Sequence, residues 1–393
     1  MEEWKECKLG DIYEVHNGLS KGGKFFGSGY PFLSFSIIFN NWFIPNELSN
    51  LVQSTDKEQE SYSIKEGDVF ITRTSETADE LGMSCVALKD YPKATYNGFC
   101  KRMRQYNHDI EVNPKYIGYY LRNPNFRLHF QAFSGSMSTR ASLTNEALLG
   151  LTVKLPPLPT QQKIADILSS LDDKIELNNK INTNLEQQAG VLFKNWFVDF
   201  EPFGGKMLEG WKEADIYSIA NIIYGSPFAS KLFNTEKNGK PIIRIRDLKD
   251  QHSDVYTPEE RDDAYLIQPK DIVVGMDGEF RPYIWGSEPG WLNQRVCVFE
   301  NKRPKGKAFL YFSIKPLLDV VEKTQVATTV IHIGKKDFDK FQIILPTEDI
   351  LDRFDELTDP LFNQIVANRL ENQRLAELRD TLLPRLMNGE LKI

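Results

Sequence analysis

Two stretches of the chain place apolar residues in alternating steps of three and four. The first stretch covers residues 156–206 and the second covers residues 346–393. Such steps put the side chains on one stripe of an α-helix, and a stripe kept over several heptads is typical of a coiled coil. We therefore predict two long helices that pack on each other. The seam positions are Ile164, Leu168, Leu171, Ile175, Asn178, Asn182, Leu185, Ala189, Leu192 and Trp196 in the first, and Leu361, Ile365, Asn368, Asn372, Leu375, Arg379, Leu382 and Leu386 in the second.

Four asparagines lie within this otherwise apolar seam. Asn178 and Asn182 occupy consecutive seam positions, and Asn368 and Asn372 occupy the same places 190 residues later. In an antiparallel pair, Asn178 would face Asn372 and Asn182 would face Asn368. Paired side-chain amides satisfy each other, and a buried polar layer fixes the register at some cost in stability. We predict this register role; the alternative is four half-exposed amides of no consequence.

The remainder of the chain has short apolar runs separated by Gly, Pro and Asn. Residues 68–72 and 271–274 are such runs, each following a polar turn. This pattern is typical of strand-rich mixed domains. The predicted boundaries are 1–155 for a first domain, 156–206 for the first helix, 207–345 for a second domain and 346–393 for the second helix.

The two mixed domains repeat one another. Trp4-Lys5-Glu6 recurs as Trp211-Lys212-Glu213, and Gly18 recurs as Gly225, both at an offset of 207. The fold class is therefore α+β: two similar mixed α/β domains joined by two long helices that form an antiparallel coiled coil, with pseudo-twofold symmetry. A helix of about 35 residues spans roughly 50 Å. B-DNA half-sites on one face recur every ~34–36 Å, so such a spacer suits a bipartite target.

Charge and cysteine usage narrow the class of protein. The net charge is −7, yet residues 1–155 carry 17 basic and 18 acidic side chains, and residues 207–345 carry 20 of each. Nearly neutral domains can present a basic face, so nucleic-acid binding stays possible. The 4 Cys and 5 His residues show no zinc-ligand or disulfide spacing. Without a long apolar run or a secretory signal, a cytoplasmic protein is expected.

Residues 18–24 are the closest approach to a catalytic motif. They have the G-x4-G-K spacing of a phosphate-binding loop, but Phe25 stands where a magnesium-binding hydroxyl belongs. No Asn-Pro-Pro-aromatic loop, HExxH pair or Cys-His pair is present in the sequence. We therefore expect no catalytic residue, no metal site and no cofactor in this chain.

Candidate DNA contacts follow from residue type. Arg and Lys bind guanine or phosphate, Asn binds adenine, and Ser and Thr bind less selectively. Each candidate could equally be an ordinary solvated side chain. The candidates are Lys21, Lys24, Arg73, Thr74, Lys101, Arg102, Arg104, Ser136, Ser138, Thr139 and Arg140 in the first domain, and Ser230, Lys231, Arg244, Arg246, Arg281, Asn293, Arg295, Thr328 and Thr329 in the second.

Several motifs resemble the specificity (S) subunit of type I restriction-modification enzymes. They are the opening Trp-Lys-Glu with Leu9-Gly10-Asp11, the runs 155–168 and 171–181, and the closing run 374–391. The resemblance covers the whole chain. One departure is that Pro346-Thr-Glu-Asp replaces the Pro-Pro-Leu-Pro-Thr-Gln-Gln stretch in the second unit. Another is Pro360, which we expect to start or kink the second helix.

The resemblance implies a role and partners. The two domains would be target-recognition domains, each reading one half of an interrupted site in double-stranded DNA. The helices would set the gap and recruit two modification subunits, which methylate adenine N6 with S-adenosylmethionine, and restriction subunits, which use ATP and Mg. This chain would be a non-catalytic subunit.

Two other functions remain open at this point. A stand-alone nucleotide-binding enzyme would use the loop at residues 18–24, and ATP binding by the purified chain would favour it. A structural adaptor would bind proteins through both domains. Weak and salt-insensitive association with DNA would favour the adaptor, since phosphate contacts weaken steeply with salt.

Overall fold

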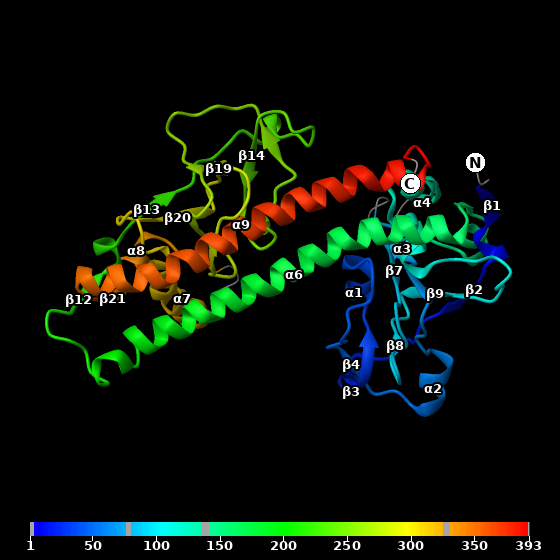
Figure 1. The fold of residues 1–393 in the computed structure, drawn as a ribbon, viewed down its shortest axis with the longest axis horizontal. Helices are drawn as coiled ribbons and strands as arrows, with labels where there is room; N and C mark the ends of the chain where they lie inside the picture. The colour runs from blue at the N-terminus through cyan, green and yellow to red at the C-terminus, as the bar shows by residue number, and fades with distance from the viewer. Residues whose placement is uncertain (1–3, 76–79, 135–140, 325–330, 392) are drawn as a thin grey trace. The chain divides into compact units, whose positions relative to one another are not determined.

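A computed structural model describes residues 4–75, 80–134, 141–324, 331–391 and 393 (Figure 1). The chain divides into two compact units. The first comprises Met1–Asp173 and Glu377–Ile393, and the second comprises Lys174–Ala376. Each unit contains one mixed α/β domain together with part of both long helices.

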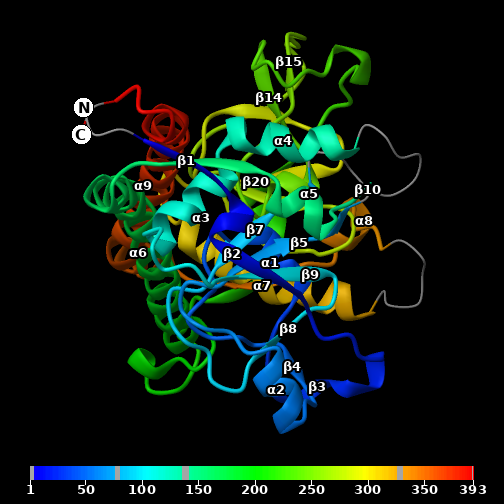
Figure 2. The same ribbon diagram turned by 90° about the vertical axis from the view of Figure 1, so that its right-hand side faces the viewer.

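The domain of the first unit is built on a four-stranded antiparallel sheet in the order β2-β9-β5-β7 (Figure 2). A smaller sheet, β4-β3-β8, contains the parallel pair β3 and β8. Helix α3 contacts β7. The strands are β1 (Lys5–Lys8), β2 (Tyr13–Asn17), β3 (Phe26–Leu33), β4 (Leu51–Val52), β5 (Val69–Thr72), β6 (Thr74–Ser75), β7 (Ser84–Val86), β8 (Thr95–Tyr96), β9 (Cys100–Gln105), β10 (Ala141–Ser142) and β11 (Thr152–Leu155).

Short helices connect these strands. Their starts carry side-chain caps: Thr55 accepts a hydrogen bond from the backbone N–H of Glu58, and Ser34, Asn113 and Thr144 cap the helices that follow them. Such caps satisfy N–H groups that have no partner within the helix. The helices are α1 (Phe35–Asn40), α2 (Asp56–Ser61), α3 (Pro114–Arg122), α4 (Pro124–Ser134) and α5 (Asn145–Leu149).

The domain of the second unit repeats this topology. Its main sheet has the order β13-β20-β17-β18, and the parallel pair β14 and β19 corresponds to β3 and β8. The prediction of two similar mixed domains is confirmed. The elements are β12 (Lys212–Asp215), β13 (Ala220–Tyr224), β14 (Lys240–Ile243), β15 (Tyr256–Thr257), β16 (Leu266–Ile267), β17 (Ile272–Gly275), β18 (Pro282–Ile284), β19 (Gly290–Leu292), β20 (Val296–Asn301), α7 (Lys307–Thr324), α8 (Lys335–Phe338) and β21 (Gln342–Leu345).

Two helices of 40 residues each, α6 (Leu158–Phe197) and α9 (Glu348–Met387), follow β11 and β21 (Figure 1). Helix α9 begins twelve residues before Pro360, so the expectation that Pro360 starts the helix is wrong. In the first unit, Ile164 of α6 and Leu383 of α9 belong to the domain core. In the second unit, Phe197 of α6 and Phe354 of α9 do the same. The start of each helix thus shares a core with the end of the other.

The asparagines of the second unit define the direction of the helices. Asn178 Nδ2 donates to Asn372 Oδ1 at 2.9 Å, and Asn368 Nδ2 donates to Asn182 Oδ1 at 2.8 Å. A step of four residues forward on α6 matches four residues backward on α9, so the helices are antiparallel. These are the two pairs expected from the sequence. Asn178, Asn182 and Asn368 are buried.

The seam of the first unit contains an ion pair. Arg379 Nη1 donates to Asp172 Oδ1 at 2.7 Å, and Tyr119 of α3 donates to the other oxygen of Asp172 at 2.5 Å. The Arg379 guanidinium also lies 5.2 Å from the ring centre of Trp42. The pair of Arg379 on α9 and Asp172 on α6 therefore joins both long helices to the domain.

Candidate nucleic-acid interface

Each domain holds a glycine loop against a turn of the sheet. The loop after β2 begins at Gly18, where an added Cβ would lie 2.1 Å from the Asn97 carbonyl oxygen. At Gly225, after β13, the corresponding distance to the Asn293 oxygen is 2.0 Å. Any larger residue would push the loop from the turn, because real Cβ atoms do not approach so closely. The glycines that repeat in the sequence therefore serve the same close approach in both domains.

Two further segments meet this turn in the second domain. The Met276 N–H donates to the Arg295 carbonyl at 2.9 Å, and the Ile333 N–H donates to the Met276 carbonyl at 2.9 Å. In the first domain the Arg73 N–H donates to the Phe99 carbonyl at 3.0 Å, and the Leu143 N–H donates to the Arg73 carbonyl at 2.9 Å. One backbone arrangement thus occurs in both domains. Thr74 corresponds to Asp277, and Phe99 corresponds to Arg295.

We call these loops the loop edge of each domain. The first loop edge consists of residues 18–25, 73–75, 97–99 and 141–143. The second consists of residues 225–232, 276–281, 293–295 and 331–333. Rigid sheets with variable loops at one edge are where proteins commonly place binding residues. Loop edges that share a frame and differ in side chains suit two different half-sites.

The first loop edge contains four of the predicted DNA contacts. Lys24 is exposed, whereas Lys21 forms an ion pair with Glu58 at 2.7 Å and donates to the Gln53 carbonyl at 2.6 Å. Arg73 is half-buried and lies 5.9 Å from the ring centre of Phe99, next to Thr74. Lys24 and Arg73 therefore carry the positive charge available here, since Lys21 is already neutralised.

Three predicted contacts on β9 have structural partners. Arg102 is buried and donates to the Ser63 carbonyl at 2.8 Å, while Arg104 makes two hydrogen bonds, at 2.7 and 2.6 Å, to the carboxylate of Asp68. Lys101 is buried against Asn145, and burial lowers its pKa, with a smaller contribution from Arg73. These side chains face the protein interior, so we withdraw them from the interface. Lys101 and Arg102 are adjacent on β9 and both are buried, so packing against other segments of the domain takes these basic residues out of the solvent.

The predicted DNA contacts of the second domain also comprise exposed side chains and side chains bound to a carboxylate. Ser230, Lys231 and Arg246 are exposed. Arg244 is committed to the carboxylate of Asp247, to which it donates at 2.8 and 2.9 Å. Arg281 is exposed beside Glu279, at 3.2 Å.

Asn293 and Arg295 lie on the turn that contacts the glycine loop. The Asn293 side chain is partly buried and that of Arg295 is 56% exposed. The remaining candidates lie outside the described residues. These are Ser136, Ser138, Thr139 and Arg140 in the first domain and Thr328 and Thr329 in the second.

Three residues of the loop edges were not predicted from the sequence. Phe99 is 60% exposed, an unusual exposure for a phenylalanine next to an arginine. Asp277 and His332 form a pair at 2.7 Å, although 55 residues separate them. The turn signals Asn97-Gly98 and Asp277-Gly278 mark two of these positions in the sequence. Nothing local marks His332.

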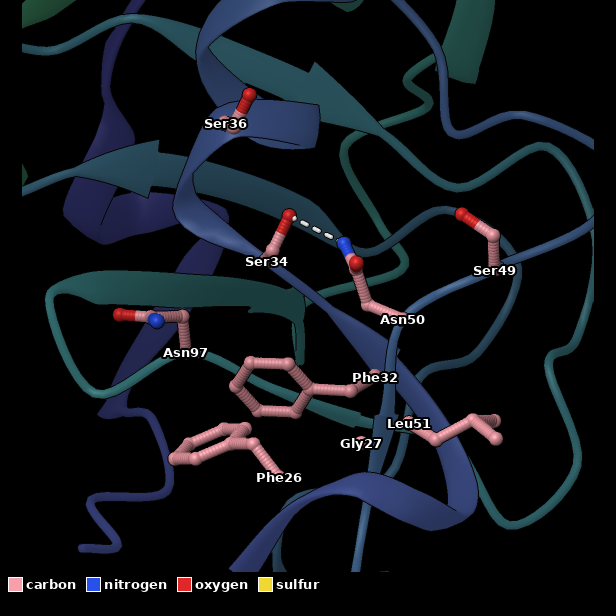
Figure 3. A pocket seen from close by; sticks show the side chains of 9 residues that line it. All are labelled: Phe26, Gly27, Phe32, Ser34, Ser36, Ser49, Asn50, Leu51 and Asn97. Carbon is pink, nitrogen blue, oxygen red and sulfur yellow. Dashed lines mark hydrogen bonds between the residues drawn. The ribbon is translucent and has the colours of Figure 1, made fainter. Parts of the chain in front are cut away.

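An open pocket of about 510 Å³ lies beside the first loop edge and shares Asn97 with it (Figure 3). Phe26 and Phe32 form its apolar side, their ring centres 5.2 Å apart. Asn50 donates to Ser34 Oγ at 2.9 Å on its polar side (Figure 3). Among the described residues that line this pocket, none is charged. Its chemistry suits uncharged polar groups and offers no catalytic acid or base.

The described residues can be searched for a metal site, a nucleotide-binding loop and a membrane-spanning helix. Within them, no group of three His, Cys, Asp or Glu side chains is placed to hold a metal ion. The loop at residues 18–24 ends in a single 3₁₀ turn, Gly23–Phe25, that leads directly into strand β3, whereas a phosphate-binding loop opens an α-helix. The structure thus speaks against a nucleotide site there. The helices that the structure describes include none with the length and apolar character to cross a membrane.

The arrangement defines a class of protein: a duplicated recognition domain whose long helices pair antiparallel. The family model "Type I restriction modification DNA specificity domain" matches residues 1–187 and again residues 208–378. The chain therefore belongs to the family of type I restriction-modification DNA specificity proteins.

Relatives and a solved structure agree with this assignment. The chain is 26% identical to the type I restriction enzyme HindI specificity subunit of Haemophilus influenzae over 474 residues, covering 100% of both. It is also 26% identical to the type I restriction enzyme MjaIX specificity subunit of Methanocaldococcus jannaschii, covering 100% of this chain and 94% of that protein. The S subunit of a type I restriction-modification system from M. genitalium has the same fold, with a TM-score of 0.57 at 14% identity, covering 98% of this chain and 96% of the other.

Proposed function

We propose that this chain is the DNA-recognition subunit of a type I restriction-modification complex and that each domain reads one half of an interrupted DNA site. The observation that carries this proposal is the duplicated loop edge. The same backbone frame holds Thr74 and Phe99 in one domain and Asp277 and Arg295 in the other. Sequence is read by side chains at base edges, so a conserved frame with different side chains gives two specificities.

The long helices are proposed to fix the gap and to bind the partner subunits. Antiparallel pairing through matched asparagines fixes the register, so the gap between half-sites should have one length. Two modification subunits would bring S-adenosylmethionine and methylate adenine N6, and restriction subunits would bring ATP-driven cleavage with Mg. This chain would supply no catalytic residue. We also propose that the complex is cytoplasmic.

Methylation mapping tests the proposal directly. The chain is expressed with its modification subunit in a host that lacks other adenine methylation, and methylated adenines are mapped by long-read sequencing. We expect one interrupted motif with a gap of fixed length. An uninterrupted motif, a variable gap or no new methylation would contradict the proposal.

Salt dependence separates DNA recognition from a protein-binding adaptor. If the exposed cations of the loop edges contact phosphates, the logarithm of the binding constant should fall linearly with the logarithm of salt concentration, by about 0.9 per phosphate contact. Titration of the purified complex with a duplex of the mapped site measures this slope. A slope near zero would favour the adaptor. ATP binding that Lys24→Ala abolishes would instead favour the nucleotide-binding enzyme.

A third prediction concerns Arg140, a predicted DNA contact of the first domain that lies outside the described residues. Arg140→Ala should impair recognition of one half-site only, because each domain reads its own half-site. The measurement compares methylation of target libraries with each half varied. Equal loss at both halves would contradict the modular assignment.

A further inference from the structure

Two charged side chains and a histidine meet at the second loop edge. His332 Nδ1 lies 2.7 Å from Asp277 Oδ1, and Arg295 Nε lies 3.6 Å from Asp277 Oδ2. The residues come from three separate segments: the turn after β17, the turn between β19 and β20, and the segment before α8. The corresponding frame of the first domain has Thr74 and Phe99 in place of Asp277 and Arg295.

The backbone holds these three residues in place. Residues flanking Asp277 are tied to both other segments: Gly278 N–H donates to the Ile331 carbonyl at 3.1 Å, and Met276 N–H donates to the Arg295 carbonyl at 2.9 Å. Asp277 also forms an antiparallel bridge with His332. The group is therefore preorganised, so little side-chain entropy remains to be lost when it binds a partner.

Asp277 fixes which atoms the other two side chains present. A carboxylate oxygen only accepts hydrogen bonds, so His332 Nδ1 carries a proton, and in the neutral tautomer of the ring Nε2 is left as an acceptor. Arg295 turns its Nε toward Asp277, so the Nη1 and Nη2 atoms of its guanidinium remain available to bind another group. Within the described part of the chain, no residue hydrogen-bonds to Nε2 of His332 or to either Nη atom of Arg295.

These free atoms match the major-groove edge of a G·C base pair. Guanine presents O6 and N7 as acceptors for the two donors of an arginine, and cytosine presents the N4 amino group as a donor. The half-exposed side chains of Arg295 (56%) and His332 (49%) are accessible to such an edge. A phosphate would meet the negative charge of Asp277, whereas a base edge carries none. The group therefore suits a base better than the DNA backbone.

Resting on the proposed function above, we propose that Arg295 and His332 read a G·C base pair in the half-site of the second domain. Arg295 binds guanine, His332 accepts from cytosine, and Asp277 is a positioning residue that holds both. The assignment names a specificity-determining site that differs from its counterpart in the first domain.

Competition binding tests this assignment in the full complex with its modification subunit. The probe is a duplex of the mapped site, and competitors replace each G·C pair, one at a time, by A·T. For one position in one half-site, the wild-type complex should prefer G·C by on the order of 10- to 100-fold. Arg295→Ala should abolish that preference and leave the other half-site unchanged.

Further variants separate positioning from general charge. Asp277→Ala should reduce the same preference, while Asp277→Asn should retain part of it, since the amide oxygen still accepts from Nδ1. Lys335→Ala removes one positive charge from the exposed ion pair with Asp339 and should leave the preference intact. Phe99→Ala, at the position in the first domain that corresponds to Arg295, should alter only the other half-site.

Two results would overturn the assignment while leaving the proposed function in place. One is an interrupted site at which Arg295→Ala keeps every base preference. The other is a uniform loss of affinity on all duplexes, which is the behaviour of a phosphate contact. Absence of any interrupted methylated site would instead overturn the proposed function itself.

Discussion

The basic residues that the sequence predicts as DNA contacts differ mainly in solvent exposure. Lys24, Lys231 and Arg295 are exposed, whereas Arg102 is buried and Arg104 is bound to Asp68. An arginine bound to a carboxylate through two hydrogen bonds is held in a fixed geometry and is not free to bind DNA. Acidic residues also divide into exposed and buried side chains, and Asp355 of α9 is the clearest buried case.

Asp355 is fully buried and pairs with Arg303 at 2.9 Å. Burial raises the pKa of its carboxyl to about 6, although Arg303 opposes this effect. The folded protein therefore binds the proton more tightly than the unfolded chain, so the stability that this carboxyl contributes is fully present below the ordinary pKa of an aspartate and is lost as pH rises from there through about 6. A shift of about two pK values corresponds to roughly 3 kcal/mol.

We expect Asp355→Asn to remove most of this loss. Thermal unfolding measured from pH 4 to pH 8 should show the wild-type melting temperature falling relative to that of the variant up to about pH 6 and levelling off above it. Asp352→Asn is the matched control, because Asp352 also binds Arg303 but is 66% exposed. A variant with the same slope as the wild type would refute the role of Asp355.

The long helices are the elements whose sequence and structure agree most closely. Their seam pairs Asn178 with Asn372 and Asn182 with Asn368, and it also leaves buried amide atoms, Asn178 Oδ1 and Asn182 Nδ2, without a partner among the described residues. An unsatisfied buried polar atom costs about 1–3 kcal/mol. The asparagine layer therefore reduces stability, and we propose that it is kept because it specifies the register.

A double-mutant cycle tests this trade-off. Asn182→Leu and Asn368→Leu, made singly, should each destabilise the protein by about 1–3 kcal/mol, since each leaves the other amide without its partner. Replacing both Asn182 and Asn368 by leucine should recover or exceed wild-type stability, because apolar layers pack well in a coiled coil. Thermal unfolding of the single and double variants measures both effects. Additive losses in the double variant would mean that the two amides do not act as a pair.

At the scale of the whole molecule, the proposed function makes the two helices a spacer. Insertion of one heptad into α6 and one into α9 at matching seam positions keeps the stripe and adds about 10 Å. B-DNA rises 3.4 Å per base pair, so the gap in the methylated site should lengthen by about 3 base pairs. Methylation mapping reads the new gap. Lys180→Ala, which removes only an exposed ion pair with Glu176, should leave it unchanged. A gap of wild-type length after the insertion would contradict the spacer role.

The sequence by itself determined the duplication, the mixed character of both domains, and the pairs of asparagines. These features follow from periodicity and from repeated order, which are local or nearly local properties of a chain. Helix seams in particular need only the spacing of residues, because 3.6 residues per turn places them on one face.

Only the tertiary structure decided which polar residues form the loop edges. It buried Lys101 and Arg102, withdrew Arg104 and Arg244 into ion pairs, and brought Asp277 beside His332 across 55 residues. Whether a charged side chain faces water or a carboxylate depends on strand register and on segments distant in sequence. The physical reason is that secondary structure follows from the local spacing of apolar and polar residues. A binding surface depends instead on which segments, distant in sequence, pack side by side.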